Sequence, residues 1–301
     1  MENFLRTRQR SRIPLLIASI LLLAAVIVVV VGLLKQEQPE PDPHEGQVYI
    51  NDGFGMVWMT PLEGVDANPI QRGEMRVVNG QPQYTGDAFE ILYGVDVSEH
   101  QWGIDWAKVA SSGLDFAMIR LGYRGYTEGG LFEDPYFRSN MEGAAANGLQ
   151  LGVYMFSQAI SVEEAFEEAE FVLERLEGYD VQMPVVYDWE KMEDVAARTD
   201  NLDEALLTQC ALAFCQRIEE AGYQACIYFN RHLGYYGFDL SQLTDYDFWI
   251  ALPGTFPDFY YRCELWQYSF SAEVPGIEGP TDMNMLFVPV ATPEPSPSAA
   301  P

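Results

Sequence analysis

Residues 151–190 have the sequence LGVYMFSQAISVEEAFEEAEFVLERLEGYDVQMPVVYDWE. Two apolar runs in this stretch, 151–157 and 184–190, have the length of strands, and the segment between them has helical spacing. Ser161 begins that helix with a glutamate three residues later, which is the spacing of a capping box, and Gly178 follows its last turn. Strand, helix and strand in this order predict a parallel βαβ unit.

The same alternation continues on both sides of this unit. Helical patterns are expected at 104–112, 135–147, 161–176 and 203–221. Apolar runs of strand length are found at 94–98, 116–121, 151–157, 184–190, 225–230, 248–252, 265–269 and 283–287. Near-continuous apolar strands that alternate with helices predict an α/β fold with a parallel sheet, and this number of strands predicts a closed TIM-like (β/α) barrel of eight strands. Because the helices shorten after Asn230, we expect the later part of the barrel to be irregular.

An apolar segment precedes the barrel. From Ile13 to Leu34 the chain carries no charged residue. A helix of this length, at about 1.5 Å per residue, spans a hydrocarbon core of about 30 Å. Arginines precede the segment and a lysine follows it, which places the N-terminus in the cytoplasm. We therefore expect a single-pass transmembrane anchor at the cell membrane with the remainder extracellular. Cleavage of the leader would instead give a secreted protein.

These patterns divide the chain into six segments. The predicted bounds are 1–12 for a basic cytoplasmic segment, 13–34 for the anchor, 35–46 for a Pro/Glu-rich linker, 47–92 for an appendage, 93–288 for the barrel and 289–301 for a disordered tail. In the appendage, Asn51-Asp52-Gly53 and Asn79-Gly80 are hairpin turn signals. We expect the appendage to pack against the barrel, the alternative being a lip over a binding groove.

The charge of the chain limits its partners. Its 301 residues include 17 Lys and Arg against 45 Asp and Glu, a formal net charge of −28. Binding a nucleic-acid backbone requires clustered basic residues, so nucleic acid is excluded as a partner. A hydrophobic content of 48% indicates a folded chain rather than a disordered one. Nothing in the sequence indicates an oligomer.

Acidic residues stand at the ends of several predicted strands, where barrel enzymes hold their chemistry. Asp188 and Glu190 are two apart on one strand, so their side chains point to one face with backbones about 6.6 Å apart. Asp96 and Asp282 lie near the ends of the first and last strands. When two carboxyls share a cavity, their pKa values move apart, so that one is an acid and the other an anion near neutral pH. Glycoside hydrolysis requires both forms. An Asp-x-Glu pair alone is a weak signal in so acidic a chain, and its spacing does not fix the stereochemical course.

Several of these motifs together resemble a known family. DVSEHQ, FAMIRLGYRGY, LGVYMFS, PVVYDWE, IYFN, FWIA, LWQYS and TDMN are similar to motifs of the family 25 glycoside hydrolases, over about Tyr93 to Phe287. These are lysozymes of the N-acetylmuramidase type, which cut the β-1,4 bond between N-acetylmuramic acid and N-acetylglucosamine in peptidoglycan. The resemblance implies an irregular eight-stranded α/β barrel with an acidic hole at its mouth, no cofactor, and peptidoglycan glycan strands as the partner.

The resemblance also implies roles for the acids. Glu190 would be the general acid, and Asp188 would orient or stabilise, one route being to hold the substrate's own 2-acetamido group as it attacks the anomeric carbon. Asp96 and Asp282 would complete the acidic hole. Two alternatives stay open: a peptidoglycan-binding protein that has lost turnover, and a chitinase-type glycosidase. In chitinase-type enzymes a longer acidic run usually precedes the Asp-x-Glu pair, whereas here PVVY precedes it.

Aromatic residues at the strand ends are candidates for substrate binding, because rings stack on sugars. The predicted set is Tyr154, Tyr228, Trp189, Phe156, Tyr123 and Trp266. Core packing is the alternative for each of them. Tyr154 and Tyr228 are preferred because they lie two residues before a polar strand end. A tyrosine that the family usually carries is replaced here in the run Ala251-Leu252-Pro253.

Metal and thiol chemistry are not indicated. His44, His100 and His232 have no metal-ligand spacing, so no metal site is predicted. His100 is expected to be a surface or hydrogen-bonded residue, the alternative being a place at the barrel mouth, four residues after Asp96. The sequence leaves open whether disulfides form among the cysteines, which are Cys210, Cys215, Cys226 and Cys263.

Overall fold

The structure is a computed structural model that describes residues 13–34, 42–192 and 195–290 of the chain. The chain separates into two compact units, divided between Gln47 and Val48. The predicted basic segment 1–12, most of the linker and the tail from residue 291 lie outside the described residues.

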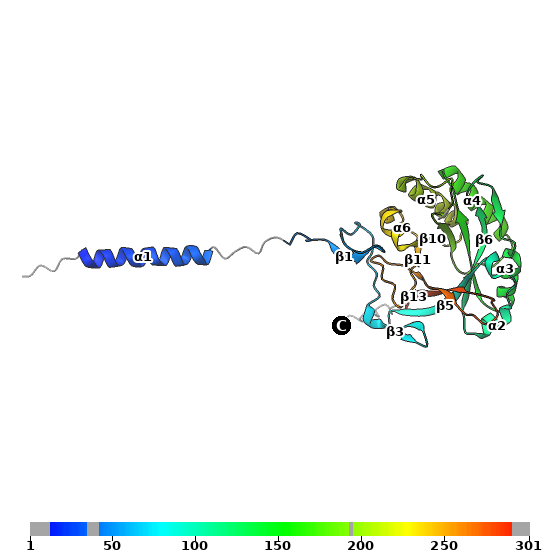
Figure 1. Cartoon of the computed structure of the whole chain (residues 1–301), viewed down its shortest axis with the longest axis horizontal. Helices are drawn as coiled ribbons and strands as arrows, with labels where there is room; N and C mark the ends of the chain where they lie inside the picture. Colours follow the sequence, from blue (N-terminus) through cyan, green and yellow to red (C-terminus); the bar gives the residue numbers. More distant parts are fainter. Residues whose placement is uncertain (1–12, 35–41, 193–194, 291–301) are drawn as a thin grey trace, which may run out of the picture. The chain divides into compact units, whose positions relative to one another are not determined.

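Among its described residues, the first unit contains one helix, α1 (Ile13–Leu34), over the predicted apolar segment (Figure 1). Side chains are described for its residues 17–32, and the large apolar ones among them are exposed. In the described part of the chain, no helix is both long and apolar enough to cross a membrane. The transmembrane anchor predicted over 13–34 is therefore not supported by the structure.

The second unit is built on a closed ring of eight strands. The ring order is β5, β13, β12, β11, β10, β9, β8 and β6, with β6 pairing back onto β5. The bounds are β5 (Phe89–Val97), β6 (Phe116–Arg124), β8 (Gln150–Ser157), β9 (Val185–Trp189), β10 (Ala225–Asn230), β11 (Asp247–Ala251), β12 (Leu265–Ala272) and β13 (Thr281–Pro289). Each of the eight predicted strands overlaps one of these, so the predicted α/β barrel is confirmed. A ninth strand, β7 (Leu131–Glu133), pairs with β6 outside the ring and was not predicted.

The last strand differs from the prediction of a parallel sheet. β13 runs antiparallel to both of its neighbours, β12 and β5, whereas the other six pairings of the ring are parallel. Only a short connection separates the end of β12 from the start of β13. A parallel crossover needs a dozen or more residues, so a short connection returns the chain antiparallel. The N-terminal end of β13 thus lies at the same edge of the barrel as the C-terminal ends of the parallel strands.

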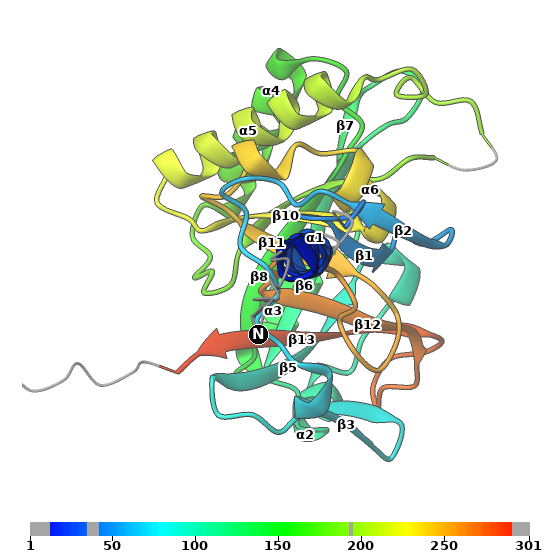
Figure 2. The ribbon, with the colours of Figure 1, turned by 90° about the vertical axis from the view of Figure 1, so that its left-hand side faces the viewer.

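Helices cover the outside of the ring. They are α2 (Trp106–Ser111), α3 (Phe137–Ala146), α4 (Val162–Leu176), α5 (Glu204–Glu220) and α6 (Arg231–Tyr236). Elsewhere the described chain has short 3-10 turns, η1 (Arg72–Glu74), η2 (Glu99–Gln101) and η3 (Leu240–Gln242). Ser161 caps α4 by accepting a hydrogen bond from the Glu164 amide at 3.3 Å, as its spacing predicts. α4 and α5 pack against each other on one side of the strands (Figure 2). The helices after β10 are short, as expected.

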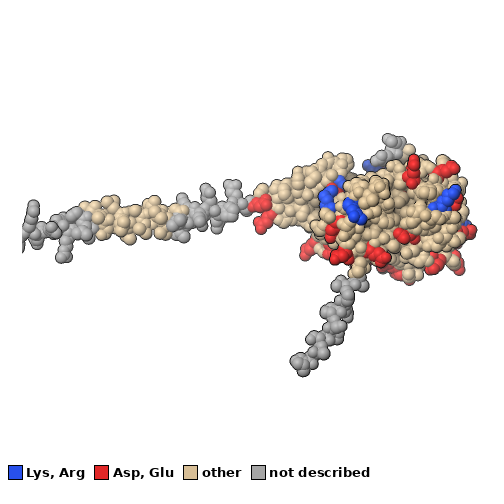
Figure 3. Space-filling view, turned by 90° about the horizontal axis from the view of Figure 1, so that it is seen from below, with Lys and Arg blue, Asp and Glu red and all other residues tan. Residues whose placement is uncertain are grey.

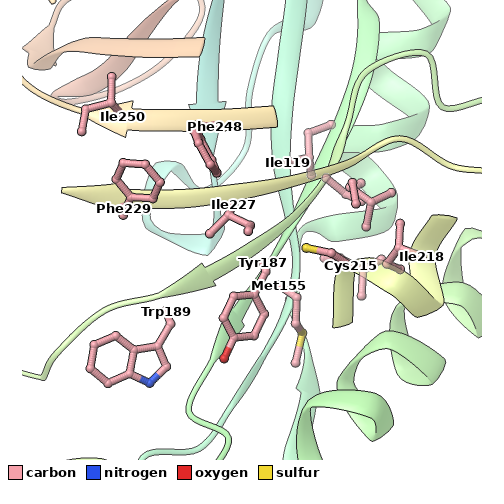
Figure 4. Packing of buried hydrophobic residues seen from close by; sticks show 14 of the residues in the cluster. Ile119, Met155, Tyr187, Trp189, Cys215, Ile218, Ile227, Phe229, Phe248 and Ile250 are labelled. Atoms are coloured by element: carbon pink, nitrogen blue, oxygen red, sulfur yellow. The ribbon is translucent and has the colours of Figure 1, made fainter. Parts of the chain in front are cut away.

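The strands bury different residues on their two faces. Outward-facing side chains pack under the helices, and Figure 4 shows Tyr187, Trp189 and Ile227 among them. A smaller cluster fills the inside of the ring, including Phe116, Met118 and Val186. This alternation, with a period of two residues along each strand, closes the bottom of the barrel with apolar groups. Polar residues one or two positions farther along the strands then face the open end.

Two hairpins precede the ring in the segment 47–92. They are β1 (Val48–Asn51) with β2 (Met56–Met59), and β3 (Met75–Val78) with β4 (Gln81–Tyr84). The Tyr236 hydroxyl of α6 donates a hydrogen bond to Asp52 at 3.0 Å, and the Leu62 amide donates one to the Tyr261 hydroxyl at 2.9 Å. These contacts fix the first hairpin to α6 and the segment after the hairpin to Tyr261.

The cysteines form no disulfide in the described chain. All four cysteines are buried and free, so the question of disulfides that the sequence left open is answered for the described residues.

Asp and Glu side chains are spread over the face shown in Figure 3, with few Lys and Arg between them. The acidic excess of the sequence is therefore mainly a solvated surface.

Candidate functional site

A cavity of about 550 Å³ opens at the edge of the barrel where the parallel strands end. It brings together the four carboxyls that the sequence singled out, Asp96, Asp188, Glu190 and Asp282. Asp96 and Asp188 lie near the ends of β5 and β9, and Glu190 directly follows β9. Asp282 reaches the same edge from the start of β13, because that strand is antiparallel.

Asp96 is the carboxyl with the most hydrogen bonds. Its Oδ2 accepts from the Asn284 side-chain amide at 2.7 Å and from the Gln267 side-chain amide at 2.9 Å. Burial raises the pKa of Asp96 to about 6, while the amide donors and a hydrogen bond from Asp282 act in the opposite direction. Asp96 is thus the easiest of these buried carboxyls to hold as an anion.

The other carboxyls hold their protons more strongly. Burial, followed by the charge of Asp96, raises the pKa of both Asp282 and Glu190 to about 7. Burial and the charges of Glu190 and Asp96 raise the pKa of Asp188 well above its usual value. Asp188 Oδ1 is buried and has no hydrogen-bond partner among the described residues. At neutral pH the cavity therefore contains both carboxylic acids and carboxylates.

Two arginines, Arg120 and Arg124, line the cavity together with these acids. Arg120, on β6, lines the cavity and donates to Asp134 at 2.8 Å through Nε and to Glu99 at 2.8 Å through its terminal nitrogen. Its positive charge lowers the pKa of Asp188, against the larger effect of burial. Arg120 was not singled out from the sequence, although it stands in the quoted FAMIRLGYRGY run at a position that alternates with buried apolar residues.

Four of the six predicted aromatic residues line the cavity. They are Tyr123, Tyr154, Phe156 and Tyr228. The Tyr228 hydroxyl donates to Gln267 at 2.9 Å, and the Tyr154 hydroxyl donates to the Val97 carbonyl at 3.4 Å. Trp249, on β11, also lines the cavity, and its ring lies edge-on to Tyr228 at 4.8 Å between centroids.

Trp189 and Trp266 do not line the cavity and instead belong to the outer core. Trp189 stands between Asp188 and Glu190, and Trp266 directly precedes Gln267. Successive side chains of a strand point to opposite faces, so each tryptophan must face away from its polar neighbour. The prediction that these two residues bind substrate does not fit their positions.

Several polar residues of the site had not been assigned a role from the sequence. Gln267 and Asn284 support Asp96, and Asn284 also accepts a hydrogen bond from the Trp249 indole at 2.9 Å. Both stand inside buried strands, where an amide side chain needs partners, and this was the available signal. His100 is exposed, as expected, and also lines the cavity. Among the described residues, no group of three or more His, Cys, Asp or Glu has the arrangement of a metal site.

A buried glutamine holds the backbone beside the acids. The Gln158 side-chain nitrogen donates to the Glu190 carbonyl at 2.9 Å, and its oxygen accepts from the Thr199 hydroxyl at 2.7 Å. Gln158 is completely buried. It therefore ties the end of β9 to the chain after the loop that follows Glu190.

Comparisons with known proteins agree with this architecture. Lysozyme M1 of Streptomyces globisporus is 25% identical over 260 residues, which cover 82% of this chain and 80% of that protein. An uncharacterised protein, YegX of Escherichia coli K12, is 26% identical over 204 residues, covering 65% of this chain and 69% of YegX.

Solved structures show the same fold. A family 25 glycosyl hydrolase from Bacillus anthracis superposes with a TM-score of 0.54 at 23% identity, over 72% of this chain and 94% of that one. The modular autolysin LytC of Streptococcus pneumoniae superposes with a TM-score of 0.57 at 23% identity, over 80% of this chain and 56% of that one.

The family itself is given by a sequence profile. The profile described as glycosyl hydrolases family 25 matches residues 95–277, which is more than half of the chain and extends from β5 to the connection before β13. The matched region contains Asp96, Asp188 and Glu190, and Asp282 lies just beyond it. With the barrel and its acidic cavity, this match shows that the chain belongs to the glycosyl hydrolases of family 25.

Proposed function

We propose that this glycoside hydrolase is a peptidoglycan hydrolase of the muramidase type, with Glu190 as its general acid. The observation that carries the proposal is the grouping of Asp96, Asp188, Glu190 and Asp282 in one cavity. The lysozyme names of sequence relatives from Streptomyces globisporus and Clostridium acetobutylicum support the substrate class. So does a structure of LytC with a synthetic peptidoglycan ligand.

Glu190 fits the role of proton donor. Its pKa of about 7, raised by burial and by the charge of Asp96, keeps a proton available at neutral pH. In the proposed reaction this proton passes to the glycosidic oxygen as the bond to the anomeric carbon breaks. The sugar then carries positive charge, which negative charge in the cavity stabilises.

Asp188 fits an orienting role. It lines the same cavity as Glu190, and its Oδ1 lacks a hydrogen-bond partner among the described residues. In a buried site a substrate N–H group that donated to this oxygen would satisfy it. We assign this N–H to the 2-acetamido group of the muramic acid, whose carbonyl oxygen can then attack the anomeric carbon. Water finally opens the resulting ring and leaves a reducing end.

The experiment is the release of reducing ends from purified peptidoglycan by the full-length protein. We expect release by the unmutated protein, and loss of at least about a thousandfold in kcat for Glu190→Gln with the fold unchanged. The matched control is Glu99→Gln, which changes another carboxyl of the cavity that is salt-bridged to Arg120; we expect a much smaller effect. If walls of several chemotypes yield no reducing ends, the protein binds peptidoglycan without cutting it. Release from chitin alone would indicate a chitinase-type enzyme.

The cellular location is a separate proposal. We propose that the apolar segment from Ile13 to Leu34 holds the enzyme at the cell membrane with its barrel outside. The supporting facts are the uncharged sequence of this segment and the arginines before it. Fractionation of cells that express the full chain tests this: we expect it in the membrane fraction, resistant to salt and released by detergent. Recovery in the medium, shortened at its N-terminus, would contradict it.

A further inference from the structure

Trp102 is a large apolar residue at an exposed position beside the cavity. It follows η2 and precedes Gly103, and 60% of its surface is exposed to solvent. Its amide donates to the Glu99 carbonyl at 3.1 Å, which closes the turn. In the described part of the chain its indole makes no hydrogen bond and no ring contact.

The backbone of Trp102 has an unusual conformation. Its φ is 51° and its ψ is −134°, a region that residues with a Cβ rarely occupy. Among the described residues other than glycine, Asn79 alone shares a positive φ, and it stands in the turn between β3 and β4. Asparagine tolerates such turns, whereas a bulky residue is disfavoured there. A glycine would satisfy the same turn without strain.

Burial does not compensate for this strain. A tryptophan stabilises a fold mainly by removing its large apolar surface from water, and this one leaves most of that surface exposed. Local backbone strain of this kind persists mainly at functional sites. The backbone conformation of Trp102 therefore costs folding free energy, and its exposed side chain offsets little of that cost through packing. This combination points to a ligand that covers the indole.

The position of Trp102 indicates which ligand. The four residues that precede it, Ser98 to Gln101, all line the cavity. Trp102 thus stands at the rim, one residue beyond the wall of the acidic site. A sugar ring presents a flat face of C–H groups to a neighbouring aromatic ring, and a polymer that enters the cavity must cross its rim.

We infer that the indole of Trp102 is a stacking platform for a sugar ring of the glycan strand, next to the ring held in the cavity. The inference rests on the proposed function, because it takes the same strand as ligand. It adds a binding position that depends on this tryptophan. Strands that reach the rim should bind more tightly than fragments that fill only the cavity.

The test measures strand affinity and stability together. The full-length protein is purified in detergent as Glu190→Gln, so that substrate is not consumed. The probe is a preparation of soluble, uncrosslinked strands of alternating N-acetylglucosamine and N-acetylmuramic acid. In this background we expect Trp102→Gly to weaken binding about tenfold and to raise Tm, because glycine relieves the strain. Trp102→Phe, which keeps a ring, should bind strands nearly as the parent does. Phe166→Ala is the control, since Phe166 is an exposed aromatic on α4.

The outcomes separate this inference from the proposed function. Unchanged strand affinity in Trp102→Gly overturns the inference, because the indole then contributes nothing to strand binding. A fall in Tm that accounts for the lost affinity also overturns it, because the residue is then structural. Turnover is measured separately on the unmutated protein. If that protein releases no reducing ends while strand binding still depends on Trp102, the inference stands and the proposed catalysis fails.

Discussion

Asp96 and Asp282 stand directly opposite each other across the antiparallel pair of β5 and β13, and one amide, that of Gln267, donates to both. The distances are 2.9 Å to Asp96 and 3.3 Å to Asp282. A hydrogen bond between the two carboxyls lowers the pKa of Asp96 and raises that of Asp282. The pair therefore shares one proton, which Asp282 holds while Asp96 is the anion.

The first prediction concerns Gln267. Replacement of Gln267 by leucine removes a donor from a carboxylate that is buried and cannot turn to water. We expect a loss of about 2 to 3 kcal/mol in the free energy of unfolding at pH 7, measured by urea denaturation. The loss should shrink near pH 4, where Asp96 is protonated. Tyr228→Phe is the control, since it removes the hydroxyl that donates to the Gln267 oxygen and leaves in place the Gln267 amide that donates to Asp96. An equal loss at both pH values would show that packing, and not charge, is responsible.

The second prediction concerns stability against pH. The pKa of Asp282 rises from 3.8 to about 7 on folding, so the folded state binds the proton more tightly than the unfolded state. The resulting stability is complete below about pH 4 and is lost as the pH rises towards 7. We expect Asp282→Asn to flatten this decline by up to about 1.4 kcal/mol per pH unit, the value for one proton. Unfolding curves at several pH values measure it, and parallel curves for the two proteins would contradict it.

Much of the fold follows from local patterns. The strand at 184–190 and the helix at 161–176 were predicted because apolar spacing, a cap and a closing glycine all agree. The direction of β13 was not, since a strand has the same apolar pattern whichever way it runs. Its short connection to β12 was the only guide. β7 escaped detection because its three residues carry almost no pattern.

The site was predictable to a similar extent. The carboxyls were found because each stands at a strand end, where side chains of different strands converge. Trp189 was misplaced because it was chosen by type, although its place between Asp188 and Glu190 already puts it on the opposite face. Gln158 could not have been found, because its contact with the Glu190 carbonyl joins two loops that only the folded chain brings together.

The third prediction concerns the pH dependence of catalysis. As a general acid, Glu190 must be protonated, so kcat should fall as the pH rises above about 7. The charge of Asp96 is the second cause of this raised pKa, after burial. Removing that charge with Asp96→Asn should therefore lower the pKa of Glu190 and move the falling limb of the profile to lower pH. The residual kcat of the variant, followed from pH 5 to pH 9, measures the limb. An unmoved limb would show that another group controls it.

The fourth prediction concerns Gln158, which acts through Glu190 and does not line the cavity. Without its amide the Glu190 carbonyl loses its tie to Thr199, and the acid can depart from its position by a fraction of an ångström. We expect Gln158→Leu to lower kcat about tenfold with little change in KM, because alignment matters most in the transition state. Thr199→Val is the matched variant: it frees the glutamine oxygen but keeps the bond to the Glu190 carbonyl, so it should retain most of kcat. The pH profile should keep its limb, since neither change alters a charge. Equal losses of kcat in both variants, in step with equal losses of stability, would reduce Gln158 to a structural residue.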